Sequence, residues 1–101
     1  MNILDQHSTE ITQLCLRFQV KSLFAFGSAI TDKFKDESDV DLIVEFSPTI
    51  PLMDYADNYF ELKFALQDLF QRPVDLLEQQ AIKNPYFLQV IEKKRLVVYE
   101  A

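Results

Sequence analysis

Apolar residues recur along this chain with two different periods, which predict helices and strands in a definite order. A first helix begins at Ser8, a suitable N-cap residue. Its apolar positions at helical spacing are Ile11, Leu14, Cys15 and Phe18. A long helix with a wide apolar and aromatic face is predicted over 52–70. A third begins at Asn84-Pro85, because asparagine caps helices well and proline suits the first helical position.

Four short apolar segments alternate with these helices and predict strands. They cover residues 22–26, 39–46, 74–77 and 96–99. Strands that alternate with helices pack as a small sheet covered by helices, so we expect an α/β (α+β) fold with a mixed sheet of about four strands. The 101 residues suffice for one domain, 1–101, and are too few for two.

The charge balance narrows the range of partners. The chain has 10 basic and 16 acidic residues, a formal net charge of −6. A protein that grips a long nucleic acid usually has a basic stripe, whereas the one basic cluster here is Lys93, Lys94 and Arg95. Cations at the end of a predicted helix are explained by the helix dipole and solvation. A long nucleic acid is therefore not expected as a partner, while a small anionic ligand bridged by metal is compatible with this charge.

The distribution of apolar residues and cysteine indicates the cellular setting. No apolar run is long enough for a membrane span or a signal peptide. The single cysteine, Cys15, cannot form an internal disulfide and fits a reducing compartment. We therefore expect a cytoplasmic protein with no membrane partner.

The first candidate ligand-binding residues directly follow the segment 22–26. Gly27, the only glycine, is followed directly by Ser28. Glycine permits close backbone approach, and a turn that opens a helix exposes amide N–H groups suited to a phosphate. The serine hydroxyl would add a donor. A Gly-Ser pair alone is weak evidence, because most such pairs are ordinary turns.

Two aspartates at the start of the next strand strengthen this interpretation. Asp39 and Asp41 are two residues apart, so their carboxylates project from the same face of a strand. The residues expected on the opposite face, packed on the core, are Val40, Leu42 and Val44. Adjacent carboxylates repel unless a cation or proton lies between them, and Mg²⁺ is the natural neutraliser. The alternative is a solvated acidic loop end, since Asp36 and Glu37 precede the pair.

A third acid lies within an apolar strand. Asp75 stands between Val74 and Leu76, and alternation directs it away from the face that those two occupy. Beside Asp39 and Asp41 it would complete a set of three carboxylates that could hold two Mg²⁺ ions for in-line displacement at a phosphate. A strand-edge acid that faces water is the alternative.

These residues together carry a family resemblance. Gly27-Ser28, ten intervening residues and the pair Asp39 and Asp41 resemble the signature of the DNA polymerase β-like nucleotidyltransferases. Almost the whole chain resembles their smallest branch, the MNT-type minimal nucleotidyltransferases, with matching flanks at 24–26, 42–44, 74–76 and 84–86. The resemblance implies that Gly27 and Ser28 contact the triphosphate. It also implies that Asp39, Asp41 and Asp75 are the catalytic residues and ligate the metal.

The resemblance also implies a biological role. MNT proteins are commonly encoded beside a HEPN-domain protein, usually an RNase toxin, and act as its antitoxin. The implied reaction is AMPylation, the transfer of AMP from ATP to a tyrosine of the HEPN toxin, with Mg²⁺ as cofactor. Two alternatives stay open: an antitoxin that neutralises its toxin by binding alone, and a small-molecule nucleotidyltransferase. The sequence fixes neither the acceptor hydroxyl nor whether the chain forms homo- or hetero-oligomers.

One stretch departs from the family pattern. Family members often carry an arginine and a glycine shortly after the Gly-Ser pair, where this chain has Ala29-Ile30-Thr31-Asp32. A basic group for the triphosphate would have to come from Lys33, Lys35 or elsewhere.

Overall fold

A computed structural model describes residues 3–26, 40–79, 84–86, 89 and 95–101 of the chain. Three helices and four strands are assigned within this part of the chain. In chain order they are α1 (Ile3–Gln6), α2 (Ser8–Arg17), β1 (Val20–Phe26), β2 (Val40–Phe46), α3 (Leu52–Phe70), β3 (Val74–Glu78) and β4 (Leu96–Glu100). Every strand and both longer helices coincide, within two residues at each described end, with the predicted segments.

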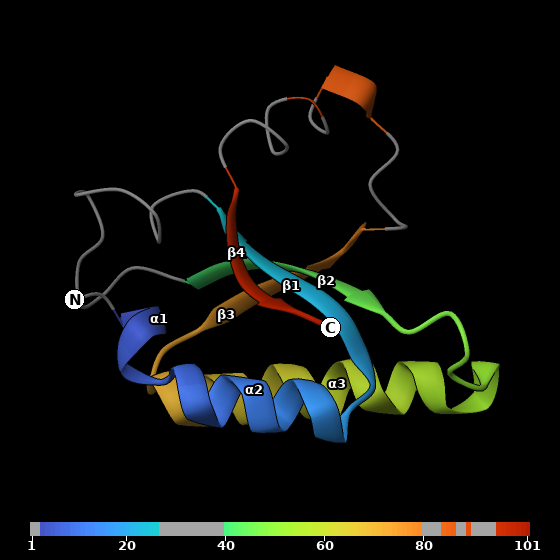
Figure 1. Ribbon diagram of the computed structural model, residues 1–101, viewed down its shortest axis with the longest axis horizontal. Coiled ribbons are helices and arrows are strands. Elements are labelled where there is room, and N and C mark those ends of the chain that lie inside the picture. Colours follow the sequence, from blue (N-terminus) through green and yellow to red (C-terminus); the bar gives the residue numbers. More distant parts are fainter. Residues whose placement is uncertain (1–2, 27–39, 80–83, 87–88, 90–94) are drawn as a thin grey trace.

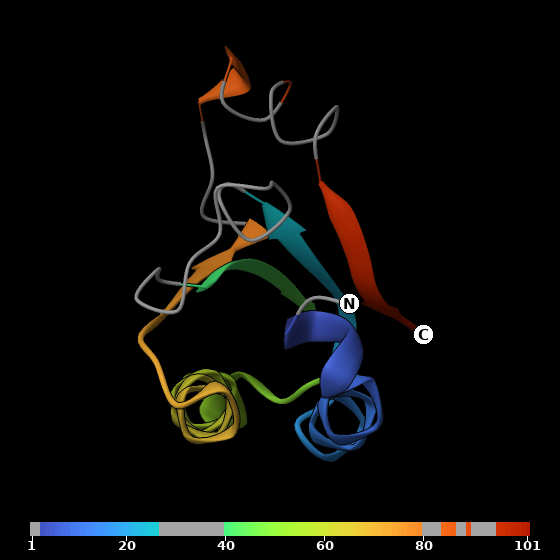
Figure 2. The same cartoon turned by 90° about the vertical axis from the view of Figure 1, so that its left-hand side faces the viewer.

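The four strands form one mixed sheet in the order β3-β2-β1-β4 (Figure 1). Strand β1 pairs antiparallel with β2 and β4, whereas β2 pairs parallel with β3. A parallel pair needs a long crossover, which α3 provides here. Helices α2 and α3 lie side by side against one face of the sheet, and residues 84–86 lie on the other side of it (Figure 2). The predicted fold class is confirmed.

The main core lies between the sheet and these two helices. Strand β2 contributes alternate residues, Val40, Leu42 and Val44, each at most 1% exposed, as its alternation predicted. Helix α2 presents Ile11 and Cys15 to this layer, and Phe18, which directly follows the helix, packs beside them. Helix α3 contributes Leu62, Leu66 and Phe70. No helix in the described part of the chain is both long and apolar enough to cross a membrane.

The start of α2 differs from the prediction. The short helix α1 ends just before it, so the chain enters α2 through His7, whose carbonyl accepts the Ile11 N–H at 2.9 Å. Ser8 is therefore the first residue of the helix rather than its N-cap, and its carbonyl oxygen accepts a hydrogen bond from Thr12 Oγ1 at 2.9 Å. The expected cap at Asn84 is confirmed, because Asn84 Oδ1 accepts the Tyr86 N–H at 3.0 Å.

Candidate active site

Two of the three predicted acids lie opposite each other in the sheet. Asp41 in β2 pairs in register with Asp75 in β3. Neighbouring strands are about 4.8 Å apart, so the two side chains leave the backbone from adjacent positions. Asp39, Gly27 and Ser28 lie outside the described residues.

The alternation of both strands determines the face that the acids occupy. Val40 and Leu42, on either side of Asp41, are buried against the helices, as are Val74 and Leu76 on either side of Asp75. Asp41 and Asp75 therefore project from the opposite face of the sheet, which we call the acid face. Asp41 is half-buried there, and Asp75 is exposed.

The acid face favours a cation. Two carboxylates on neighbouring strands repel each other unless a positive charge lies between them. Carboxylate oxygens are hard ligands of the kind that Mg²⁺ prefers, and that ion usually takes only one or two of them and fills its shell with water and phosphate oxygens. Within the described ranges, which exclude residue 39, no three histidine, cysteine or acidic side chains are close enough together to hold a metal ion. The described part of the site is thus a pair of acids that fits Mg²⁺ in its chemistry.

Apolar side chains continue the acid face along the strands. Phe24 and Ile43 are at most 6% exposed and form a second small core with the half-buried Phe26 and Leu77. The guanidinium of Arg95 lies over this cluster, with its Cζ atom 4.1 Å from the centroid of the Phe24 ring. The sequence alone had attributed this arginine to a helix end. Its aromatic partner is far away in the sequence, so only the strand pairing reveals the contact.

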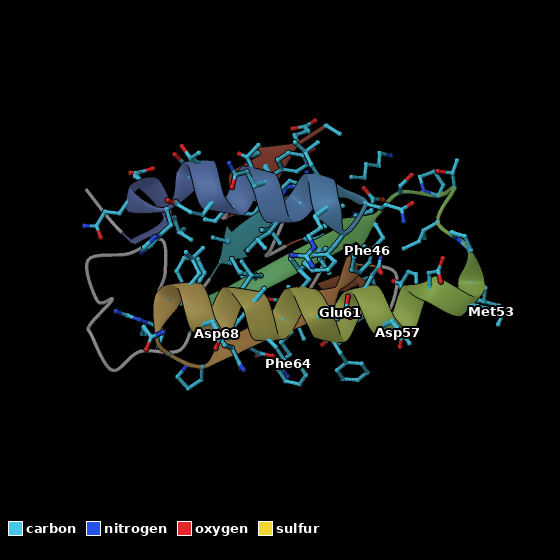
Figure 3. The ribbon with its side chains drawn as sticks, turned by 90° about the horizontal axis from the view of Figure 1, so that it is seen from below. Phe46, Met53, Asp57, Glu61, Phe64 and Asp68 are labelled. Carbon is cyan, nitrogen blue, oxygen red and sulfur yellow. The ribbon has the colours of Figure 1, made fainter. Side chains whose placement is uncertain are left out.

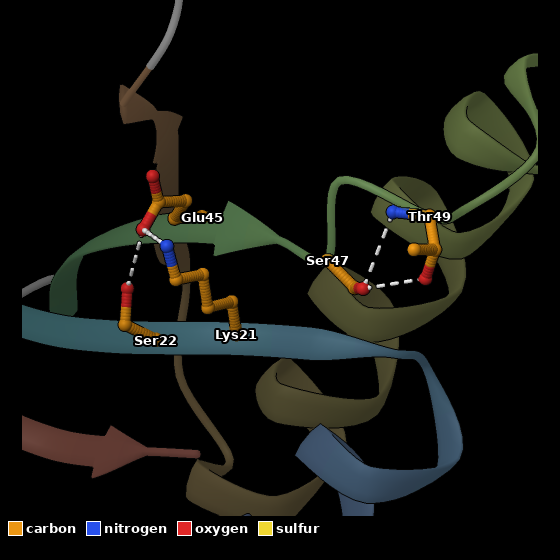
Figure 4. A network of polar contacts seen from close by, with 5 residues as sticks. All are labelled: Lys21, Ser22, Glu45, Ser47 and Thr49. Atoms are coloured by element: carbon orange, nitrogen blue, oxygen red, sulfur yellow. Dashed lines mark hydrogen bonds and ion pairs between the residues drawn. The ribbon is translucent and has the colours of Figure 1, made fainter.

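A second polar network joins β1 to β2, at the end of β2 far from Asp41 (Figure 4). The Ser22 hydroxyl donates to Glu45 Oε1 at 3.2 Å, and Lys21 Nζ lies 3.9 Å from the same oxygen. Ser22 pairs with Glu45 in register, four positions along β2 from Asp41. Each group in this network has a partner, and an ion pair with an exposed lysine contributes little stability. We assign it a structural role at the strand end.

Two tyrosines attach α3 to the strand that carries Asp75. The Tyr55 hydroxyl donates to Glu78 Oε2 at 2.7 Å, and the Tyr59 hydroxyl donates to the Leu76 carbonyl at 2.6 Å. Burial, the hydrogen bond to Glu78 and its negative charge raise the pKa of Tyr55 to about 12. Burial also raises the pKa of Tyr59, with smaller effects from the charges of Glu78 and Asp75. Both hydroxyls are therefore held protonated, as donors that fix the position of β3.

The outer side of α3 is more apolar than a solvated helix face needs to be. Phe60 and Phe64 are 51% and 56% exposed, and their rings stack with centroids 6.4 Å apart. Asp57 and Glu61 are exposed on the same helix, on the side turned away from the sheet (Figure 3). The wide apolar face predicted for 52–70 thus has two parts. One part is buried against the sheet, and the part that contains Phe60 and Phe64 is exposed to solvent.

Comparison with known proteins places this arrangement in a family. Residues 8–98 match the nucleotidyltransferase domain. The chain is 37% identical over 97 residues to a Methanocaldococcus jannaschii protein provisionally named a protein adenylyltransferase, and the match covers 96% of this chain and 92% of that protein.

Solved structures agree with this match. One provisionally described as a minimal nucleotidyltransferase has a TM-score of 0.73 and 26% identity and covers 95% of each chain. An MNT antitoxin in complex with a tri-AMPylated HEPN toxin from Shewanella oneidensis has a TM-score of 0.64 and 15% identity. That similarity covers 97% of this chain and 73% of the solved one and, at this identity, shows the fold alone. The match along most of the sequence shows that this chain belongs to the nucleotidyltransferase family, in its group of minimal nucleotidyltransferases.

Proposed function

We propose that this chain is a Mg²⁺-dependent protein adenylyltransferase that transfers AMP from ATP to a tyrosine hydroxyl of a HEPN-type toxin and so acts as its antitoxin. The observation that carries the proposal is the pairing of Asp41 with Asp75 on one face of the sheet, in a chain of the nucleotidyltransferase family. The name of the Methanocaldococcus relative supports a protein acceptor, and the AMPylated Shewanella complex supports a HEPN partner.

The acids would act together on one reaction. Asp41 and Asp75, with Asp39 beside them in the sequence, would hold Mg²⁺, which when bound neutralises phosphate charge and lowers the pKa of an incoming hydroxyl. Gly27 and Ser28 would contact the triphosphate. The tyrosine oxygen forms a bond to the α-phosphorus while the bond to the β-phosphate oxygen breaks and pyrophosphate leaves. Asp75, the exposed member of the described pair, is the candidate to accept the hydroxyl proton.

The outer side of α3 supports a protein acceptor over a small molecule. Phe60 and Phe64 present two stacked aromatic rings to solvent, and exposed aromatic patches of this kind mark surfaces that bind other proteins. The acids Asp57 and Glu61 lie beside them, so a partner with an apolar groove and basic rim would fit better than a second copy of this chain.

The test is transfer from labelled ATP with Mg²⁺ in the presence and absence of the HEPN-type protein encoded beside this chain. Wild type should label the partner. Asp41→Asn and Asp75→Asn should each slow transfer by about 100-fold or more, because losing a metal ligand removes several kcal/mol of charge stabilisation. Asp68→Asn is the matched control, since Asp68 is an exposed acid on α3. This variant should transfer AMP at the wild-type rate.

Two outcomes would reject parts of the proposal. Transfer by Asp41→Asn and Asp75→Asn at the wild-type rate would remove these acids from the chemistry. If wild type transfers no label yet forms a complex that silences the partner without ATP, the chain is a binding antitoxin. Circular dichroism on each variant shows whether the fold persists, and chelation of Mg²⁺ should stop transfer in every active protein.

A further inference from the structure

Arg95 occupies a defined position at the edge of the acid face. Strand β4 begins at Leu96, which pairs with Ala25, and Arg95 directly precedes it. Arg95 therefore stands at the level of Phe26, the residue that pairs with Asp41. One row across the sheet thus runs from Arg95 through Phe26 and Asp41 to Asp75.

The guanidinium lies on the same face as the two acids. Its Cζ atom is 4.1 Å from the centroid of the Phe24 ring, and Phe24 belongs to the apolar cluster with Ile43 on that face. Two strand spacings, about 10 Å, separate the backbone of Arg95 from that of Asp41. The row therefore presents a cation on one side and a pair of carboxylates on the other, within the reach of one elongated ligand.

The contact with Phe24 suits an anion-binding arginine. A guanidinium that stacks on an aromatic ring uses its flat face for the ring, and its N–H groups point outward around the edge. Phe24 is only 6% exposed, so the ring that supports the guanidinium is itself fixed in the sheet. Less side-chain entropy is then lost when a ligand binds.

The charges on this face require such a group. Asp41 and Asp75 attract Mg²⁺, but their own negative charges offset part of the charge of any ion that they hold, so the phosphate chain of ATP is not neutralised by metal alone. The residues after the Gly-Ser pair, Ala29-Ile30-Thr31-Asp32, include no basic side chain, and the next two lysines, Lys33 and Lys35, lie outside the described residues. Arg95 provides a planar donor set that matches phosphate oxygens in a bidentate manner.

We infer that Arg95, held on Phe24 beside the acid pair, binds the phosphate chain of the nucleotide beyond the phosphorus atom that is attacked. This inference rests on the proposed function and adds a ligand-binding residue to it. Arg95 then acts on the leaving pyrophosphate portion, whereas Asp41 and Asp75 act at the reacting phosphate.

Nucleotide affinity tests this role directly. Dissociation constants for ATP and for AMP, each with Mg²⁺, are measured by calorimetry for wild type, Arg95→Gln and Arg95→Lys. Arg95→Gln should weaken ATP binding by about 10- to 100-fold, the usual effect of losing a charge-assisted bidentate contact, and should change AMP binding by less than about 3-fold. Arg95→Lys keeps the charge without the planar guanidinium, so its dissociation constant for ATP should lie between those of wild type and Arg95→Gln.

The chain offers a matched control. Arg17 also lies over a phenylalanine ring, with its Cζ atom 5.2 Å from the centroid of Phe18, but it belongs to α2 in the helical layer. Arg17→Gln should leave both dissociation constants unchanged. Thermal melting of all three variants shows whether the loss of a ring contact alone affects the fold.

The outcomes separate this inference from the proposed function. If wild type binds ATP and labels the partner while Arg95→Gln binds ATP equally well, the inference is wrong and the function stands. Equal weakening of ATP and AMP would place Arg95 at the nucleoside or in support of the fold, which also overturns the inference. If wild type neither binds ATP with Mg²⁺ nor transfers label, the proposed function fails together with the inference.

Discussion

The hydroxyl group of Tyr55 links α3 to the strand that carries Asp75, and replacing Tyr55 by phenylalanine removes that link alone. The hydroxyl donates to Glu78 Oε2 at 2.7 Å. The ring packs edge-on against Phe46, with centroids 5.1 Å apart, and phenylalanine would preserve this contact. Tyr55→Phe therefore isolates one hydrogen bond between the crossover helix and β3.

The expected cost near neutral pH follows from the environment of that bond. A hydrogen bond to a charged acceptor contributes about 1.5–3 kcal/mol to stability. Tyr55 and Glu78 are both half-buried, so water can solvate the carboxylate once the hydroxyl is gone. We therefore expect Tyr55→Phe to lower the free energy of unfolding by about 1 kcal/mol at pH 7.

The same bond should make that cost depend on pH. The pKa of Tyr55 is raised from 10.0 to about 12, by burial first and then by Glu78. Between these values the folded state binds more protons than the unfolded state. The contribution of Tyr55 to the free energy of unfolding is therefore complete below pH 10 and is lost as the pH rises through about 12. Two pKa units correspond to about 2.7 kcal/mol, which solvent screening at this half-buried hydroxyl reduces to about 1–2 kcal/mol. The difference in the free energy of unfolding between wild type and Tyr55→Phe should therefore shrink above pH 10 and vanish in strong alkali.

Urea unfolding followed by circular dichroism provides the assay, because the chain has no tryptophan. Wild type and Tyr55→Phe are compared at pH 7, 9, 10, 11 and 12. Cys15, whose pKa burial also raises, is present in both proteins, so its contribution cancels. Tyr86→Phe, at a residue 77% exposed, is the control and should match wild type. A Tyr55→Phe deficit that stays constant from pH 7 to 12 would refute the reasoning.

Three further predictions test the core, the thiol and the outer side of α3. Leu66 is fully buried, so Leu66→Ala should lower the free energy of unfolding in urea by about 2–5 kcal/mol, and a loss below about 1 kcal/mol would contradict this packing. Burial raises the pKa of the Cys15 thiol to about 12, so a disulfide reagent at pH 8 should label it only after denaturation; rapid labelling of native protein would contradict its burial. Phe60→Ser combined with Phe64→Ser should change stability by less than about 1 kcal/mol yet weaken binding to the HEPN-type partner by about 10-fold or more, and an unchanged dissociation constant would exclude this surface.

Local sequence patterns predicted most of the fold because they report burial directly. Alternation in β2 placed Val40 and Leu42 in the core, and helical spacing did the same for Ile11 and Cys15. The prediction that Ser8 is the N-cap of α2 was wrong. The four-residue helix α1 precedes it and makes His7 the N-cap, and the capping preference of one serine cannot reveal such a preceding helix.

The arrangement of the site depended on information that local patterns lack. Alternation indicated that Asp75 turns away from the core, but the strand order and the parallel register decide that it lies opposite Asp41. Strand pairing likewise decides that Arg95 meets Phe24. Phe60 and Phe64 fit a helical apolar face equally well inside or outside the core, and only the position of α3 against the sheet resolves this.

The parallel pairing of β2 with β3 has a consequence for how the protein acquires its activity. The two strands are joined through the 19-residue helix α3, so Asp41 and Asp75 meet only after this helix has docked and closed a long loop. Contacts between residues distant in the sequence form late in folding, because the chain entropy of loop closure is lost before they stabilise the structure. A nascent or partly folded chain therefore carries both acids without a site. Substitutions that slow the docking of α3 should delay the appearance of activity during refolding without altering the turnover of molecules that have finished folding.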